Sequence, residues 1–305
     1  MWDGSTATEF AAGTGKKEDP YIIKNGAQLA YAVKNNKEGE WYKQICDITL
    51  YVNRHGNAPY SPNPFHSLWI DSSWGKDVKW KAQYDGGSHF VKGAYVDTEG
   101  KGLFGDIDKG GAVANLGIID SHARKGAGLF AGRMNGKITN CIAQGTVGSL
   151  HSFDDDYYLD YCGGICSLVG PDNSDAVVED CISAVYTMMW SFADYTPFVC
   201  LSDNNKGVVK NCLTVLPVTH LDKVMQPAHI TMEGKTYLQN CYWLKGYEEQ
   251  PTGFTLEEIC NSLGKQTRWK NYNGYFPTLK SFAETDMAKL LMVKFIAVFT
   301  FPNNI

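Results

Sequence analysis

A short pattern that recurs along the middle of the chain constrains its fold more than any other feature. The pattern is an apolar residue, a variable residue, Asn or Asp, and then Cys or Leu. It recurs at spacings of 25 to 40 residues, in segments 113–116, 138–141, 178–181, 209–212 and 238–241. Repeats of this length are typical of solenoids, in which each unit buries its apolar face only against the next unit.

A second apolar segment precedes each copy of the pattern. Each unit therefore contains a short strand, a turn rich in Gly, Asn or Asp, and a second strand. Coils stacked about 4.8 Å apart would place equivalent residues directly above one another. This predicts two inward columns, one of Phe104, Phe130, Ile165, Val199 and Ile230, and one of Leu116, Cys141, Cys181, Cys212 and Cys241.

The residue before the second column is Asn or Asp in every copy of the pattern. These short polar side chains tolerate the left-handed backbone conformation and satisfy nearby backbone amides. We therefore expect a polar ladder at one corner of the coil, formed by Asn115, Asn140, Asp180, Asn211 and Asn240.

The predicted fold is all-β, a right-handed parallel β-helix with short helical caps at both ends. Residues 1–99 would form the N-terminal cap and first coils, 100–247 the repeats, and 248–305 a C-terminal cap helix and tail, within one continuous domain. Asn25 is the expected cap of a helix over 27–35 that covers the first coil. Thr255 is the expected cap of a second helix, over 254–264, that covers the far end with a buried stripe of Leu256, Ile259, Cys260 and Leu263.

The nine cysteines do not indicate a metal site. Cys162 and Cys166 are four residues apart, but no second pair with zinc-ligand spacing follows. Within the column, Cys serves as a small buried apolar residue. A bridge between Cys166 and Cys200 is not expected, because neighbouring parallel strands rarely offer disulfide geometry. No metal or other cofactor is predicted.

Charge and motifs exclude several functional classes. The net charge is −5 and the 28 basic residues are spread along the chain, which argues against a nucleic-acid partner. No run of 18 apolar residues predicts a membrane-spanning helix. The chain has no nucleophile elbow, no HExxH pair and no phosphate-binding loop. The sequence therefore favours a protein without catalytic activity.

The repeat resembles the GLUG-repeat family of extracellular bacterial proteins, typical of gut Bacteroidetes. Gly102–Gly105 and Gly128–Ala131 carry the repeat motif, and Trp2–Gly4 with Asp19–Ile23 resemble the usual entry to such a domain. The resemblance implies an adhesin-like or accessory protein, outside the cell or on its surface. Since Met1 is followed by no basic and apolar leader, this implies that a signal peptide is missing from the sequence.

Three long connections follow the second, third and fourth repeats, and in a solenoid they would lie side by side on one edge. They combine aromatic rings with carboxylates, a mixture that suits sugar or peptide binding. We expect a glycan or protein ligand at the cell surface to contact Asp154, Asp155, Asp156, Tyr157, Tyr158, Asp160, Trp190, Asp194, Tyr195, His220 and Asp222.

Other interpretations of this edge remain open. The loops could be solvated acidic turns whose rings pack on the coil, within a purely structural spacer. Polysaccharide cleavage would need two carboxyl groups about 5–5.5 Å or 6.5–9.5 Å apart, and long loops are a poor platform for that geometry. Calcium binding is weakly indicated, because the Asp cluster lacks the Gly and Glu of an EF-hand loop.

Overall fold

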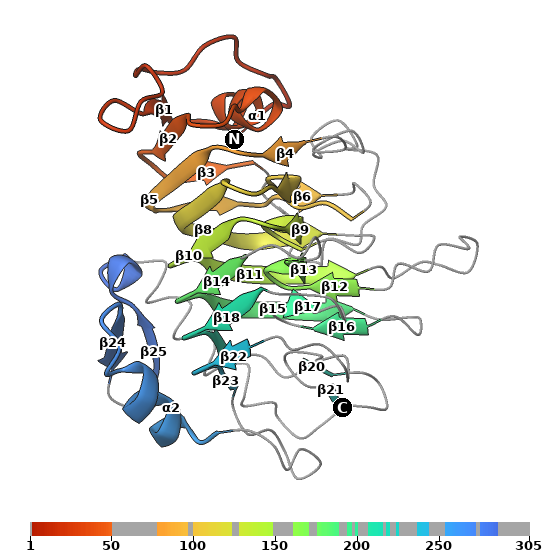
Figure 1. Ribbon diagram of the computed structural model, residues 1–305, viewed down its shortest axis with the longest axis vertical. Coiled ribbons are helices and arrows are strands. Elements are labelled where there is room, and N and C mark those ends of the chain that lie inside the picture. The colour runs from red at the N-terminus through yellow and green to blue at the C-terminus, as the bar shows by residue number, and fades with distance from the viewer. Residues whose placement is uncertain are drawn as a thin grey trace, which may run out of the picture.

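Over the residues that it describes, the computed structural model is mostly parallel β-sheet with two α-helices (Figure 1). The structure describes residues 2–50, 78–96, 100–123, 128–148, 161–170, 176–188, 194–196, 199–200, 207–215, 218–219, 224–225, 237–243, 254–272 and 275–285. Neither α-helix in these ranges is long and apolar enough to cross a membrane. The all-β class expected from the sequence is confirmed.

The largest sheet pairs equivalent segments of successive repeats, and all its pairings are parallel. Strand β8 (Ala112–Ala123) begins two rows, because its two halves pair with two different strands of the next repeat. One row continues through β10 (Lys137–Thr139), β14 (Val177–Glu179), β18 (Val208–Lys210) and β22 (Tyr237–Gln239). The other continues through β11 (Ile142–Gly148), β15 (Ile182–Met188), β19 (Leu213–Thr214) and β23 (Tyr242–Trp243).

Strands from the N-terminal part extend the same sheet, and a second parallel sheet shares its core. The N-terminal strands are β1 (Tyr21–Ile23), β2 (Trp41–Gln44), β3 (Ile48–Thr49), β5 (Gln83–Lys92) and β6 (Tyr95–Val96). The second sheet contains β4 (Lys79–Trp80), β7 (Asp106–Ile107), β9 (Ala131–Met134), β13 (Cys166–Val169) and β17 (Val199–Cys200). One buried cluster includes side chains from both sheets.

The first predicted column is confirmed over three of its members. Phe104, Phe130 and Ile165 are fully buried, and their backbones are linked by hydrogen bonds from Phe104 N to Phe130 O and from Phe130 N to Ile165 O, each 2.9 Å. Val199 was placed wrongly, because its register partner is Cys166 and not Ile165. The register of this repeat therefore differs by one residue from the register expected when the apolar residues of the repeats are aligned. Ile230 lies outside the described residues.

The second predicted column is confirmed. Leu116, Cys141, Cys181 and Cys212 are buried, and Cys241 packs partly buried against the same cluster. Successive cysteine side chains contact one another along the row. Each Sγ also donates to the carbonyl oxygen two residues earlier, as from Cys181 to Glu179 O at 3.2 Å. Cysteine thus fills the core and satisfies a corner carbonyl.

The polar corner is also confirmed. Asn115, Asn140, Asp180, Asn211 and Asn240 all have left-handed backbones, with φ between 52° and 55°. This conformation turns the chain between the two strands of each repeat. Only Gly, Asn and Asp adopt it routinely, which explains why no other residue type occupies the position.

The cysteine column predicts a graded thiol reactivity. Burial raises the pKa of the Cys141 and Cys212 thiols, whereas Cys46 is partly exposed. We expect an alkylating reagent to modify Cys46 in the folded protein at least about 100-fold faster than these two, which react only after the core opens. Mass spectrometry of peptides after timed alkylation measures the ratio. Equal rates would contradict the column.

The helix at the N-terminal end forms as predicted. Helix α1 (Gly26–Asn35) begins after Asn25, whose Oδ1 accepts from Gln28 N at 2.9 Å. Leu29 and Val33 are fully buried in the main core, and Figure 1 shows α1 at the end of the stack. α1 therefore closes that end of the core.

The C-terminal helix has the predicted cap but a different place. α2 (Leu256–Leu263) begins at Thr255, which forms a capping box with Glu258. An antiparallel pair, β24 (Trp269–Tyr272) and β25 (Tyr275–Leu279), and a 3-10 helix (Lys280–Phe282) follow. We call residues 254–272 and 275–285 the flank segment. Within α2, Ile259 and Leu263 are fully buried, whereas Leu256 and Cys260 are only partly so.

The flank segment runs along the side of the stack, so the expectation that α2 covers the far end was wrong (Figure 1). It packs on outward-facing apolar residues, among them Phe90, Ile142, Ile182 and Leu213. The last three are register partners on successive strands. An apolar column on the outer face needs a cover, and this requirement fixes where the segment lies.

Candidate functional site

Two of the long insertions end in strands that pair with each other. β12 (Tyr161–Gly163) follows the first insertion, and β16 (Asp194–Thr196) lies in the second. They form a parallel pair in which Tyr161 is the partner of Asp194 and Cys162 the partner of Tyr195. The backbones of two sequence-predicted site residues, Asp194 and Tyr195, therefore lie beside the end of the preceding insertion.

The third insertion lies between two further short strands. β20 (Val218–Thr219) and β21 (Val224–Met225) pair antiparallel, and β20 contacts β15. We call β12, β16, β20 and β21 the insertion edge. Figure 1 shows these strands on the side of the stack opposite the flank segment.

The remaining predicted site residues lie outside the described residues, and their role stays a prediction. These residues are Asp154, Asp155, Asp156, Tyr157, Tyr158, Asp160, Trp190, His220 and Asp222. For Asp194 and Tyr195 the structure describes the backbone but not the side chains.

Sequence reasoning missed a polar column on the strands next to the insertion edge. Tyr95, His122 and Thr146 are register partners on β6, β8 and β11, and β11 contacts β12. His122 is only 3 % exposed, its Nδ1 is 2.5 Å from Thr146 Oγ1, and its ring centroid is 4.9 Å from that of Tyr95. Counting residues from the left-handed corner of each repeat would have aligned His122 with Val147, because a register shift between Ala143 and Gly145 displaces the pairing by one residue. His122 is therefore held between two half-buried partners, in a column that can support the neighbouring edge.

Asp106, a carboxylate elsewhere in the described ranges that is almost fully buried, has structural partners. Asp106 pairs with Lys101 Nζ at 2.5 Å and accepts from Arg133 N at 2.9 Å, which ties a loop to the next strand. Within these ranges, no three His, Cys, Asp or Glu side chains converge as metal ligands.

Comparison with known protein sequences found limited similarity. No protein-family model matches the chain. Halomucin of Haloquadratum walsbyi (strain DSM 16790 / HBSQ001) is 26 % identical over 188 residues, which are 60 % of this chain and 2 % of halomucin. This chain thus matches a very small part of that protein.

A solved structure resembles this chain over most of the length of both proteins. It is described as a "putative immunoglobulin A1 protease" from Bacteroides ovatus, with a TM-score of 0.50 and 17 % identity over 89 % of this chain and 95 % of that one. At this identity the likeness concerns the fold alone.

Proposed function

We propose that this chain is a right-handed parallel β-helix of the GLUG-repeat type, which binds a glycan outside the cell without catalysing a reaction. The in-register parallel stacking and the buried columns support the β-helix. The likeness to a protein named as a mucin is consistent with a place outside the cell.

The observation that carries the binding role is the parallel pairing of β12 with β16. It brings the ends of two insertions rich in Asp and aromatic residues to one edge, on the side away from the flank segment. Rings stack on the apolar faces of sugars, and carboxylates accept hydrogen bonds from their hydroxyl groups. A rigid stack that presents several such loops together suits an extended polysaccharide better than a small molecule.

A glycan array probed with the whole chain tests the proposal. We expect binding to at least one class of polysaccharide, and we expect the double variant Asp194→Ala/Tyr195→Ala to weaken it about tenfold or more, as loss of two contacts implies. The matched control is Tyr272→Ala/Tyr275→Ala on the flank segment, which should leave binding unchanged.

Two outcomes would contradict the proposal. Release of reducing ends from a bound polysaccharide, abolished by Asp155→Ala or Asp160→Ala, would identify an enzyme. Absence of binding to every glycan, with specific capture of a host protein that the double variant abolishes, would identify a protein-binding module. Incubation with immunoglobulin A1 tests peptide-bond cleavage, which we expect to be absent.

A further inference from the structure

The Asn side chains at the corner form a ladder with a fixed direction. Asn115 Nδ2 donates to Asp85 Oδ1 at 2.8 Å, Asn140 Nδ2 donates to Asn115 Oδ1 at 2.7 Å, and Asn240 Nδ2 donates to Asn211 Oδ1 at 3.2 Å. In these three rungs the amide donates to the residue one repeat earlier, so the acceptor is satisfied by the donor of the following repeat.

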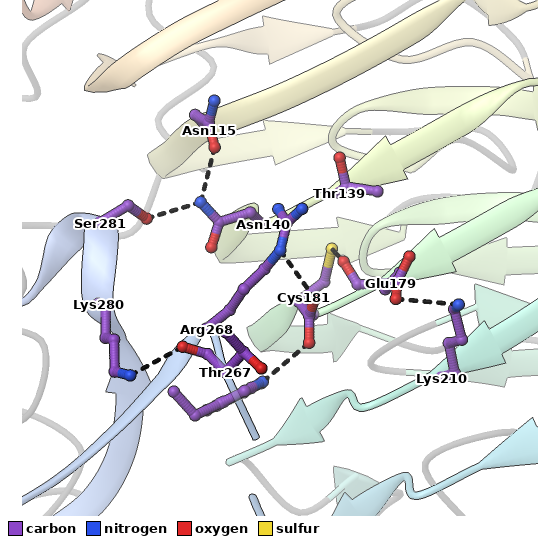
Figure 2. Close-up of polar contacts among 12 residues, drawn as sticks. Asn115, Thr139, Asn140, Glu179, Cys181, Lys210, Thr267, Arg268, Lys280 and Ser281 are labelled. Carbon is purple, nitrogen blue, oxygen red and sulfur yellow. Dashed lines mark hydrogen bonds and ion pairs between the residues drawn. The ribbon is translucent and has the colours of Figure 1, made fainter. Parts of the chain in front are cut away.

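The ladder is interrupted where Asp180 replaces Asn. By register, Asp180 follows Asn140, and an ionised carboxylate has no proton to donate. Asn140 Oδ1 is buried and has no hydrogen-bond partner, which is the one such side-chain atom among the described residues. Figure 2 shows this oxygen pointing away from Asn115. An unsatisfied buried acceptor destabilises the folded protein and requires an explanation.

Asp180 is also the point at which the flank segment is attached. Its Oδ1 accepts from Trp269 Nε1 at 3.1 Å, and its Oδ2 is 3.4 Å from Arg268 Nε. The side chain of Asp180 is 6 % exposed, whereas that of Arg268 is 52 % exposed, so the guanidinium is largely solvated. A second contact joins Asn140 Nδ2 to Ser281 Oγ at 2.7 Å (Figure 2).

We propose that Asp180 is a proton-dependent latch for the flank segment: the neutral carboxyl group donates its proton to Asn140 Oδ1 and still accepts from Trp269 Nε1. Protonation would then complete the ladder and remove a buried charge at the same time. Ionisation leaves Asn140 Oδ1 unsatisfied and relies on a solvated arginine for compensation.

The electrostatic surroundings agree with this assignment. Burial raises the pKa of Asp180, and neighbouring Glu179 and Cys181 raise it further, against the opposing effects of the Trp269 hydrogen bond and of Arg268. Lys210 pairs with Glu179 at 2.9 Å, and the other side chains along the ladder, Asn140 and Asn211, are neutral.

The sign of the pH effect follows from the raised pKa. When the flank segment opens, Asp180 meets water and returns to its ordinary pKa, so the closed form binds the proton more tightly. Closure is therefore favoured below the ordinary value near 3.9 and weakens as the pH rises through the raised value.

Hydrogen exchange of peptides from residues 254–285, corrected for the intrinsic effect of pH, tests the latch. In the wild type we expect the opening equilibrium to increase several-fold between pH 4.5 and 7.5, because the closed form binds the proton of Asp180 more tightly than the open form. Asp180→Asn should remove this dependence and hold the segment closed at pH 7.5. Its Nδ2 can donate to Asn140, and its Oδ1 can accept from Trp269.

Arg268→Gln is the second variant, because it leaves the ladder and the indole contact in place. Without the cation, ionisation becomes harder, and the opening transition should move to higher pH. The latch is overturned if Asp180→Asn opens the segment more than the wild type at pH 7.5, because the ionised carboxylate would then be the stabilising form. Identical pH profiles for the wild type and Asp180→Asn would overturn it as well.

Discussion

Replacing Phe130 by Ala lowers the free energy of unfolding by about 3–5 kcal/mol, which is the range for removing a large buried ring. Phe130 is fully buried between Phe104 and Ile165, with backbone hydrogen bonds to both neighbours. These strands are part of a close-packed stack and cannot collapse into the space without breaking their register. A cavity would therefore remain, and its cost adds to the lost burial of the ring.

Urea denaturation followed by circular dichroism measures this loss. Tyr275→Ala is the control, because Tyr275 is 40 % exposed on the flank segment and its removal should change stability by no more than about 0.5 kcal/mol. Stacked repeats can unfold in parts, so two probes should be compared before one free energy is quoted. A loss below about 1 kcal/mol for Phe130→Ala would show that the column is not a close-packed core.

The sequence allowed the columns to be predicted because their chemistry repeats at one structural position. Asn140 and Cys141 recur as Asn211 and Cys212, and only a stack of parallel strands gives such a recurrence a physical reason. The left-handed turn at each Asn follows from the same argument, since few residues tolerate that backbone.

The displacement of Val199 could not be predicted, because apolar letters alone do not fix register. Phe198, Val199 and Cys200 are all apolar, so the sequence offers three equivalent alignments with Ile165. The hydrogen bonds of β17 with β13 select one of them. A shift by one residue moves each side chain to the other face of a strand.

The position of the flank segment was missed for a different reason. Ile142, Ile182 and Leu213 follow the cysteine column directly, so they face outward, and their apolar character indicated an outer cover. The sequence did not say which segment supplies it. The role of Asp180 depended on that answer, because its partner Trp269 lies 89 residues away in the chain.

The sequence predicted that the insertions of the candidate site share one edge of the stack, but it did not predict their individual contacts. Alignment of the repeats indicated that the insertions lie near one another, and the pairing of β12 with β16 agrees for two of them. Individual contacts depend on loop conformations, which no repeat constrains. Asp194 and Tyr195 are the predicted site residues whose backbones the structure describes.

Replacing Trp269 by Ala should detach the flank segment and cost about 3–5 kcal/mol, the range for truncating a buried tryptophan. Trp269 is 1 % exposed and lies in the cluster that covers Ile182 and Leu213, while its Nε1 donates to Asp180. The substitution thus removes packing and the indole hydrogen bond together. We expect faster hydrogen exchange over residues 254–285 and a greater tendency to self-associate, because an apolar column becomes exposed.

Trp269→Phe separates the two contributions, because it keeps most of the ring and deletes the donor. Its cost should be about 1–3 kcal/mol, as expected when a buried carboxylate loses a hydrogen bond. Combining Trp269→Phe with Asp180→Ala, which removes the acceptor, gives the coupling energy between the two side chains, and only a contact between them makes the double variant less costly than the sum. Additive costs, with unchanged exchange in residues 254–285, would mean that the segment is held by its apolar contacts alone. A positive coupling would instead make the Asp180 corner the site at which the stack fixes the position of its cover.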